Sequence, residues 1–176
     1  MEATKEINWL VAEAVSPFMK KNGFWRRRLV FSRPFQHGFD VVVFQKSSWN
    51  SAADGRFTFS VGIYWSKAEE MNGTGVSGMP FSDSHCTVWE RIGFLMQPPA
   101  DKWWVISSQR HVLHLPDEII STIGTYALPW FQAGHNIDTS FLFAVKHHHT
   151  EKIRALTWLK DEPGRSTGKS RLTPRR

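Results

Sequence analysis

Apolar residues recur at spacings of three and four through the first part of the chain. The spacing predicts an amphipathic helix from about Thr4 to Lys21, with Ile7, Leu10, Val11, Ala14 and Phe18 as its stripe. Gly23 follows as the natural stop of this helix. Pro17 lacks a backbone donor, so we expect a kink in the last turn.

Three strand-like segments follow the predicted helix. Phe57 to Ile63 alternates between apolar and polar positions, which places one apolar face on a core. Val41 to Phe44 is apolar on both faces, as expected of a central strand. Arg27 to Arg33 is more polar and indicates a strand nearer the sheet edge.

The second half of the chain mixes predicted strands and helices. Ser66 to Ser84 is rich in glycine, serine and threonine and predicts a long loop. Thr87 to Leu95 and Trp103 to Ser107 predict two further strands. Pro116, followed by two acidic residues, predicts a helix start, and Leu128-Pro129 predicts the end of that helix.

Two shorter segments complete the pattern. Asp138 is a candidate cap for a helix that runs to Val145, although Thr139 to Val145 also fits a strand. Ile153, Leu156 and Leu159 indicate one or two further amphipathic turns. Together these elements predict an α+β fold, mainly an antiparallel sheet of about five strands with an N-terminal helix and C-terminal helices packed on it.

Composition divides the chain into a folded part and a basic tail. We expect one domain over residues 1–161 and a disordered tail over residues 162–176, which contain no large aromatic side chain. The chain has 22 basic and 16 acidic residues, a formal charge of +6. From Pro163 onward there are five basic residues and no acid, so residues 1–162 carry 17 basic residues against 16 acidic ones, about +1.

The sequence gives no sign of export or of a membrane span. Its continuous apolar runs, such as Val41 to Phe44, are far short of the roughly 20 residues that a membrane helix needs. No secretory signal is visible at the N-terminus. The single cysteine, Cys86, excludes an intramolecular disulfide. We therefore expect a cytoplasmic protein with no membrane partner.

The remaining positive charge is concentrated where the first helix meets the first strand. The cluster consists of Lys20, Lys21, Arg26, Arg27, Arg28 and Arg33. One interpretation is a phosphate-binding patch, because each phosphate contact releases counterions. The other is a solvated helix end beside a charged edge strand. The sequence leaves both interpretations open.

Histidine is the residue type that most invites a metal or catalytic hypothesis. His147, His148 and His149 are adjacent, and His111 and His114 lie three apart. A zinc site needs three or four ligands with supporting geometry, and neither group has a recognised zinc spacing. We therefore expect no metal site and no cofactor.

No catalytic motif is assembled in the sequence. Cys86 lies beside His85, but neighbours on a strand point to opposite faces and rarely form a nucleophile and base pair. An enzyme that uses Glu90, His111 or His114 would need a cleft where these side chains converge. We therefore expect a protein without enzymatic activity.

Aromatic residues make up 14% of the chain, and some of them are expected on the surface. Trp25 adjoins the arginine run, Trp49 lies in a polar stretch, and Trp65 opens the predicted loop. Exposed tryptophan and arginine most often anchor protein interfaces. The candidate partner-binding residues are Arg26, Arg27, Arg28, Trp49, Trp65, Glu69 and Glu70.

Several short motifs occur in a recognisable order between about Ile7 and Phe131. They are Gly23-Phe24, Phe31 with Arg33, Phe44-Gln45-Lys46-Ser47-Ser48-Trp49-Asn50, Phe57-Thr58-Phe59-Ser60-Val61-Gly62-Ile63, Arg91-Ile92-Gly93, Asp101-Lys102-Trp103-Trp104 and Leu128-Pro129-Trp130-Phe131. This ordered set resembles the bacterial domain-of-unknown-function family 4304. The resemblance implies a small intracellular α+β domain with no assigned activity and no known catalytic residues.

The resemblance also singles out polar positions that recur in the family. They are Arg33, Gln45, Ser47, Trp49, Arg91, Asp101 and Trp104. Such positions could form a shared site or a buried polar network that holds the sheet. We favour the network for Arg33, Gln45, Ser47, Arg91, Asp101 and Trp104.

Two functions remain as hypotheses from the sequence. The first is a non-enzymatic bacterial protein-binding domain, in particular an immunity protein that neutralises a cognate toxin or effector by direct binding. The alternative is a nucleic-acid-binding protein that uses the basic cluster and the tail.

Overall fold

Six antiparallel strands form one sheet in the computed structural model, which describes residues 3–51, 54–107 and 114–161. The strands are β1 (Trp25–Arg27), β2 (Val30–Phe35), β3 (Gly38–Lys46), β4 (Asp54–Trp65), β5 (Val88–Arg91) and β6 (Trp104–Ser107). Their order is β1-β2-β3-β4-β5, and β6 also pairs with β4. The predicted α+β class and mainly antiparallel sheet are confirmed.

The longest strand, β4, connects the two parts of the sheet. One of its edges pairs with β3. The other edge pairs first with β6, from Asp54 to Phe57, and then with β5, from Ser60 to Ile63. The predicted central segment, Val41 to Phe44, lies in β3 between two neighbouring strands, which confirms that prediction.

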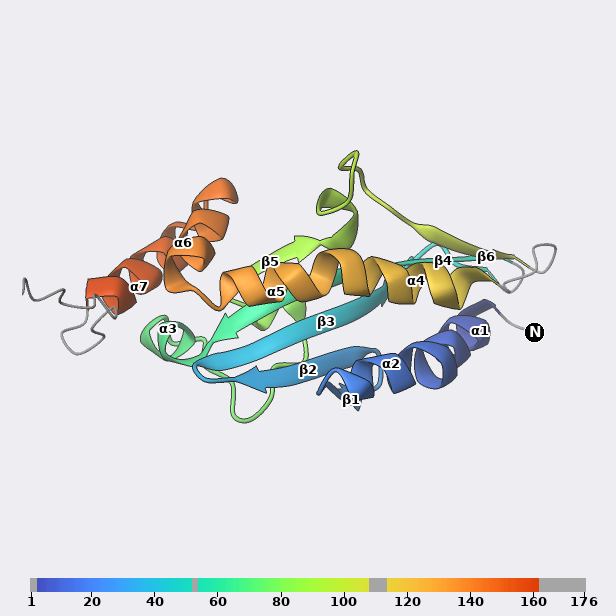
Figure 1. Ribbon diagram of the computed structural model, residues 1–176, viewed down its shortest axis with the longest axis horizontal. Coiled ribbons are helices and arrows are strands. Elements are labelled where there is room, and N and C mark those ends of the chain that lie inside the picture. Colours follow the sequence, from blue (N-terminus) through green and yellow to red (C-terminus); the bar gives the residue numbers. More distant parts are fainter. Residues whose placement is uncertain (1–2, 52–53, 108–113, 162–176) are drawn as a thin grey trace, which may run out of the picture.

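Two long helical segments lie across one face of the sheet (Figure 1). The first consists of α1 (Ala3–Trp9), the π-helical turn η1 (Leu10–Val15) and α2 (Ser16–Lys21). The second consists of α4 (Leu115–Thr122), the π-helical turn η5 (Ile123–Ala127) and α5 (Leu128–Gly134). Beyond them, α6 (Ile137–Lys146) and α7 (Thr150–Asp161) pack together at the end where α3 (Ser66–Met71) lies.

The core lies between this face of the sheet and the two helical segments. The alternation predicted along β4 is confirmed, because every second side chain from Phe57 to Trp65 belongs to the core. The predicted N-terminal stripe packs there too, with Ile7, Leu10 and Val11 buried. Burial of each such side chain contributes about 1.5–3 kcal/mol, so this contact holds the first helix on the sheet.

The opposite face of the sheet is covered in part by residues 72–87, here called the covering segment. Ser32 Oγ donates a hydrogen bond to the carbonyl oxygen of Pro80 at 2.9 Å, and Gln45 Nε2 donates to Asp83 Oδ2 at 2.5 Å. Cys86 lies over Gly62, where a Cβ atom would be 2.5 Å from the cysteine Sγ. The glycine therefore lets the covering segment approach the sheet closely.

The predicted loop from Ser66 to Ser84 is wrong at both ends. Ser66–Met71 form α3, and Asp83–His85 form a 3₁₀ turn, η2. Lysine, alanine, glutamate and methionine in α3 are all good helix formers, and two of its side chains, Ala68 and Glu69, are buried.

Both long helical segments continue through a proline. The helix predicted to end at Leu128-Pro129 instead runs on to Gly134. Pro129 and Pro17 each occupy the second residue of a helix that follows a π-helical turn. The regular backbone bonding is already altered there, so the missing proline N–H costs less than in an unbroken helix.

The segment from Arg27 to Arg33 is a hairpin and not a single strand. Arg28 and Leu29 form its turn between β1 and β2, and Arg28 has a φ of +56°. This left-handed conformation favours glycine or asparagine and costs other residues about 1–2 kcal/mol.

Two other boundaries differ from the predicted ones. The strand expected from Thr87 to Leu95 is limited to β5, because Ile92–Phe94 form a 3₁₀ turn, η3. The segment from Thr139 to Val145 is helical within α6, and its cap is Asn136 instead of Asp138. The Asn136 Oδ1 atom accepts hydrogen bonds from two backbone N–H groups of the first turn, at 2.8 and 3.2 Å.

The predicted disordered tail, residues 162–176, lies outside the described residues. Among the helices that are described, none has the length and apolar character needed to cross a membrane.

Candidate interaction surface

The short edge strand β1 presents its side chains on both faces of the sheet. Trp25 lies directly opposite Ser32, in a row that continues to Val41 and Gly62 beneath the covering segment. Arg26 lies opposite Phe31, in the neighbouring row that belongs to the helix-covered core. Because side chains alternate along a strand, Arg27 shares the face of Trp25. The arginine run is therefore divided between two surfaces.

On the first of these surfaces an arginine lies over one exposed aromatic side chain and shares its strand face with another. We call Trp25, Arg27, Phe81 and His85 the aromatic–arginine surface. Trp25 is 63% exposed and Phe81 is 50% exposed. The Arg27 Cζ atom lies 5.2 Å from the centre of the Phe81 ring, and the His85 ring meets that ring edge-on with centroids 4.5 Å apart. The hydrogen bond from Ser32 to Pro80 holds Phe81 beside β1.

The second surface is a concave one between the first helix and the hairpin. We call it the basic groove; it has a volume of about 400 Å³ and is lined by Asn8, Ala12, Arg26, Arg28, Leu29 and Lys46. Lys46 comes from the end of β3, and its Nζ atom donates to Asn8 Oδ1 at 3.3 Å. The structure thus brings Arg26 and Arg28 together with a lysine that was not part of the predicted cluster.

Arg33, the last cation of the predicted cluster, is partly buried and paired within the protein. Its Nε and Nη2 atoms donate to Asp40 Oδ2 at 2.9 and 2.6 Å, and Asp40 is fully buried. His135 Nε2 lies 2.8 Å from the other carboxylate oxygen, and the Arg33 guanidinium lies over the Phe24 ring at 4.5 Å. This Arg33–Asp40–His135 cluster joins β2 and β3 to the end of α5.

Two predicted partner-binding residues are not on the surface. Trp65 is only 2% exposed, and its Nε1 atom donates to Ser140 Oγ at 3.0 Å. Glu69 is fully buried; its Oε2 atom pairs with Lys152 Nζ and accepts from Thr74 Oγ1 at 2.6 Å. Contacts from distant segments enclose both side chains, so they are structural residues and not interface residues.

The other candidates on this list are exposed. Glu70 lies on the outer side of α3, and Trp49 is 92% exposed in the turn between β3 and β4. Trp49 lies beyond the end of β3, whereas Trp25 is level with Val41 near its middle. Trp49 is therefore not part of the aromatic–arginine surface.

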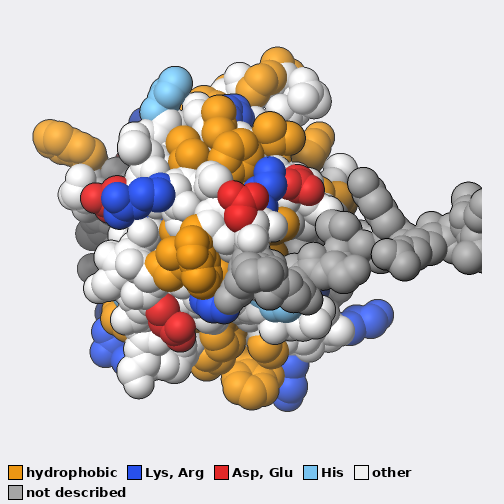
Figure 2. All heavy atoms as spheres, turned by 90° about the vertical axis from the view of Figure 1, so that its left-hand side faces the viewer, with side chains coloured by type: hydrophobic (Ala, Val, Ile, Leu, Met, Phe, Trp, Pro, Cys, Tyr) orange, Lys and Arg blue, Asp and Glu red, His pale blue; other side chains and the backbone are white. Residues whose placement is uncertain are grey.

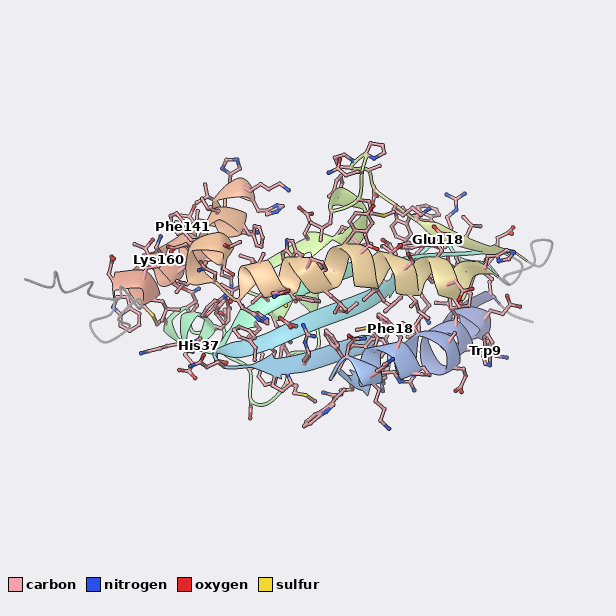
Figure 3. All side chains as sticks on the ribbon, viewed as in Figure 1. Trp9, Phe18, His37, Glu118, Phe141 and Lys160 are labelled. Carbon is pink, nitrogen blue, oxygen red and sulfur yellow. The ribbon has the colours of Figure 1, made fainter. Side chains whose placement is uncertain are left out.

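The six polar residues proposed as one network form separate contacts. Besides the Arg33–Asp40 pair and the Gln45–Asp83 bond, Ser47 Oγ accepts from the backbone N–H of Trp49 at 3.2 Å. Arg91 Nη1 donates to Asp101 Oδ1 at 2.8 Å, and Trp104 Nε1 donates to Glu118 Oε1 at 2.9 Å (Figure 3 labels Glu118). These bonds hold individual strands, turns and helices in place at several points of the sheet.

The candidate acid and base groups take part in other contacts. Glu90 Oε2 lies 3.2 Å from Lys146 Nζ and 3.0 Å from His147 Nε2, which joins β5 to the end of α6. His114 is exposed just before α4, and His111 lies outside the described residues. Burial lowers the pKa of His149, and the neighbouring His147 and Lys152 side chains lower it further.

Cys86 is buried in the covering segment. Burial raises the pKa of its thiol, and the negative charge of Asp83 raises it further, so the thiol is protonated at neutral pH. Across the described ranges, no three histidine, cysteine, aspartate or glutamate side chains are placed to hold a metal ion.

The end of the molecule with α3, α6 and α7 is a rival interaction surface. Leu142, Val145 and Trp158 are exposed there. In Figure 2, which views this end, the visible hydrophobic side chains gather in several groups separated by charged and other polar residues. Lys160 lies over the Phe141 ring at 4.5 Å, so part of the aromatic surface is already occupied by a contact within the protein (Figure 3).

Sequence reasoning missed Phe81 and Lys46. Phe81 was overlooked because its segment looked like an unsupported loop, whereas Pro80 beside it is fixed to β2. Lys46 lies directly after Gln45, one of the recurrent polar positions. Only the pairing of β2 with β3 brings it near Arg28 in the hairpin turn, eighteen positions earlier.

Comparison with protein families gives a match that covers most of the fold. The model of a domain of unknown function (DUF4304) matches residues 15–133, from the end of η1 into α5. The matched interval contains all six strands, the hairpin and the covering segment. No curated protein and no solved structure matches the chain. Because the family match extends over more than half of its length, the chain belongs to the DUF4304 family.

Proposed function

We propose that this chain is a non-enzymatic bacterial protein-binding domain that acts in the cytoplasm as an immunity protein, neutralising a cognate toxin or effector by direct binding. The aromatic–arginine surface supports the proposal best. Tryptophan and arginine are the side chains most enriched among residues that dominate binding energy, and here the arginine lies over an exposed phenylalanine.

The geometry of this surface favours binding at a low entropic cost. Trp25 is anchored on a strand, and Arg27 already lies over Phe81 before any partner arrives. A partner that covers them loses little side-chain freedom and removes two aromatic rings from water. Arg33, Glu69 and Glu90, in contrast, are engaged within the fold and are not available as such anchors.

The experiment is co-expression with the product of the neighbouring gene, followed by co-purification and titration calorimetry. We expect Trp25→Ala and Phe81→Ala each to weaken binding at least tenfold and to reduce protection from the toxicity of that product. Trp49→Ala is the matched control, because this tryptophan is even more exposed but lies outside the surface. It is expected to leave the affinity unchanged.

Two outcomes would reject the proposal. If the neighbouring product neither co-purifies nor becomes less toxic, the immunity function is wrong. If it binds but Trp25→Ala has no larger effect than Trp49→Ala, the aromatic–arginine surface is not the interface.

Nucleic-acid binding is the second candidate, and the exposed guanidinium groups of Arg26, Arg27 and Arg28 favour it. The division of these arginines between two faces and the internal pairing of Arg33 leave a smaller continuous basic surface than the sequence predicted. A gel shift would support this function if the affinity for nucleic acid fell steeply as the salt concentration rose. The affinity should also fall in the variant in which Arg26, Arg27 and Arg28 are all replaced by alanine. Absent or salt-insensitive binding would reject it.

A further inference from the structure

The basic groove collects positive charge from three separate parts of the chain. Arg26 comes from β1, Arg28 from the hairpin turn and Lys46 from the end of β3. The Asn8 amide and the apolar side chains of Ala12 and Leu29 complete the lining. None of the described residues that line it is acidic, so the cations repel one another there without a compensating charge.

The two arginines of the groove differ in their contacts from the other arginines of the sheet. Within the described residues, neither Arg26 nor Arg28 makes an ion pair or a side-chain hydrogen bond. Elsewhere on the sheet, Arg33 and Arg91 are each paired with an aspartate at 2.6 and 2.8 Å. The donors of Arg26 and Arg28 are therefore available to a ligand, and a guanidinium group matches the geometry of phosphate oxygens.

The backbone of Arg28 adds an independent observation. Its φ of +56° places an arginine where a hairpin turn favours glycine or asparagine. Strained conformations of this kind concentrate at functional positions, where the strained residue contributes something that an unstrained one would not. At this position, an arginine contributes a guanidinium group at the rim of the groove.

Size and lining limit what the groove can hold. A volume of about 400 Å³ is in the range of small-molecule sites, and Ala12 and Leu29 offer an apolar surface to the uncharged part of a ligand. A carboxylate would neutralise one of the three cations, whereas a phosphate monoester carries close to two negative charges and three acceptor oxygens.

We infer that the basic groove binds the phosphate group of a small phosphate monoester. Arg26 and Arg28 contact the phosphate oxygens from the hairpin side, and Lys46, positioned by Asn8, contacts them from the end of β3. This site lies on the opposite face of β1 from the aromatic–arginine surface, so it does not depend on the proposed protein-binding function.

The test is titration calorimetry of the full chain with inorganic phosphate, a sugar monophosphate and a single-stranded oligonucleotide. We expect saturable binding of the sugar monophosphate at one site per chain, competed by inorganic phosphate. Arg28→Gly is expected to weaken it at least tenfold. This variant removes the guanidinium group but suits the left-handed backbone, so a folding defect would not explain the loss.

Arg27→Ala is the matched control, because Arg27 faces the other surface, and it is expected to leave phosphate affinity unchanged. The inference is overturned if neither phosphate nor the sugar monophosphate binds saturably, or if Arg28→Gly binds as tightly as the parent chain. Binding of the oligonucleotide alone would also overturn it in favour of nucleic acid. Partner binding that survives in Arg28→Gly and fails in Trp25→Ala would separate the two sites.

Discussion

The arginines of the first hairpin occupy two contrasting environments. Arg33 is stacked on Phe24 and bound to the buried Asp40, whereas Arg26 and Arg28 lie at a groove with no acidic partner among the described residues. A run of like charges in the sequence is therefore not one functional unit. Register and burial decide which cations stabilise the fold and which remain available for a ligand.

The largest effect is expected when the Asp40 carboxylate, which pairs with Arg33, is removed. We expect Asp40→Ala to lower the free energy of unfolding by about 3 kcal/mol, because it leaves a partly buried guanidinium group without its counter-charge. Urea denaturation measures the loss. A decrease of less than 1 kcal/mol would mean that the Arg33–Asp40–His135 cluster is not a major source of stability.

The Lys152–Glu69 pair tests whether removing one partner of any buried ion pair lowers the stability of the fold. Lys152→Met leaves the fully buried Glu69 without its ion-pair partner, and we expect a loss of about 2 kcal/mol. The double variant Lys152→Met with Glu69→Gln is expected to recover part of that loss, because no unpaired charge remains. A double variant less stable than Lys152→Met would contradict this explanation.

For Arg28, which has no acidic partner among the described residues, we expect a substitution to stabilise the fold. Arg28→Gly is expected to raise the free energy of unfolding by about 0.5–1 kcal/mol, because glycine adopts the left-handed conformation without strain but loses more backbone entropy on folding. Thermal or urea denaturation would detect the increase. A clear destabilisation would show that Arg28 makes structural contacts that matter more than its backbone strain.

The smallest expected effect concerns a pair at the surface. The hydrogen bond from Arg91, and after it that from Trp103, lowers the pKa of Asp101. Such a carboxylate adds stability above its ordinary pKa of about 3.9, and the contribution is lost as pH falls through the lower pKa of the folded state. Because Asp101 is largely exposed, we expect only a minor effect on stability.

NMR titration is the sensitive measurement for this pair. In Arg91→Ala the pKa of Asp101 should rise toward its ordinary value but stay below it, because Trp103 still donates at 2.9 Å. An unchanged pKa would show that the Arg91 contact is not maintained in solution.

Regular periodicity made much of the fold predictable. The stripe from Ile7 to Phe18 and the alternation from Phe57 to Ile63 identify the first helix and β4, because each pattern follows directly from the geometry of one element. The end of the second long helix was missed, since a π-helical turn before Pro129 has no simple sequence pattern.

The site was less predictable, because it depends on residues that are far apart in the sequence. Trp25 and Trp49 are exposed, whereas Trp65 is buried and donates a hydrogen bond to Ser140, 75 positions later. Glu69 likewise meets Lys152 only after the chain has returned through α7, 83 positions later. Local composition cannot show such contacts.

The strand that carries both candidate sites is only three residues long. A single-residue insertion or deletion in Trp25–Arg27 would shift the register by one position, so that Trp25 and Arg27 would face the groove and Arg26 would face the covering segment. Exposed loop tips normally tolerate changes in length. This edge strand should not, and we expect relatives to keep the number of residues between the first helix and the hairpin turn constant.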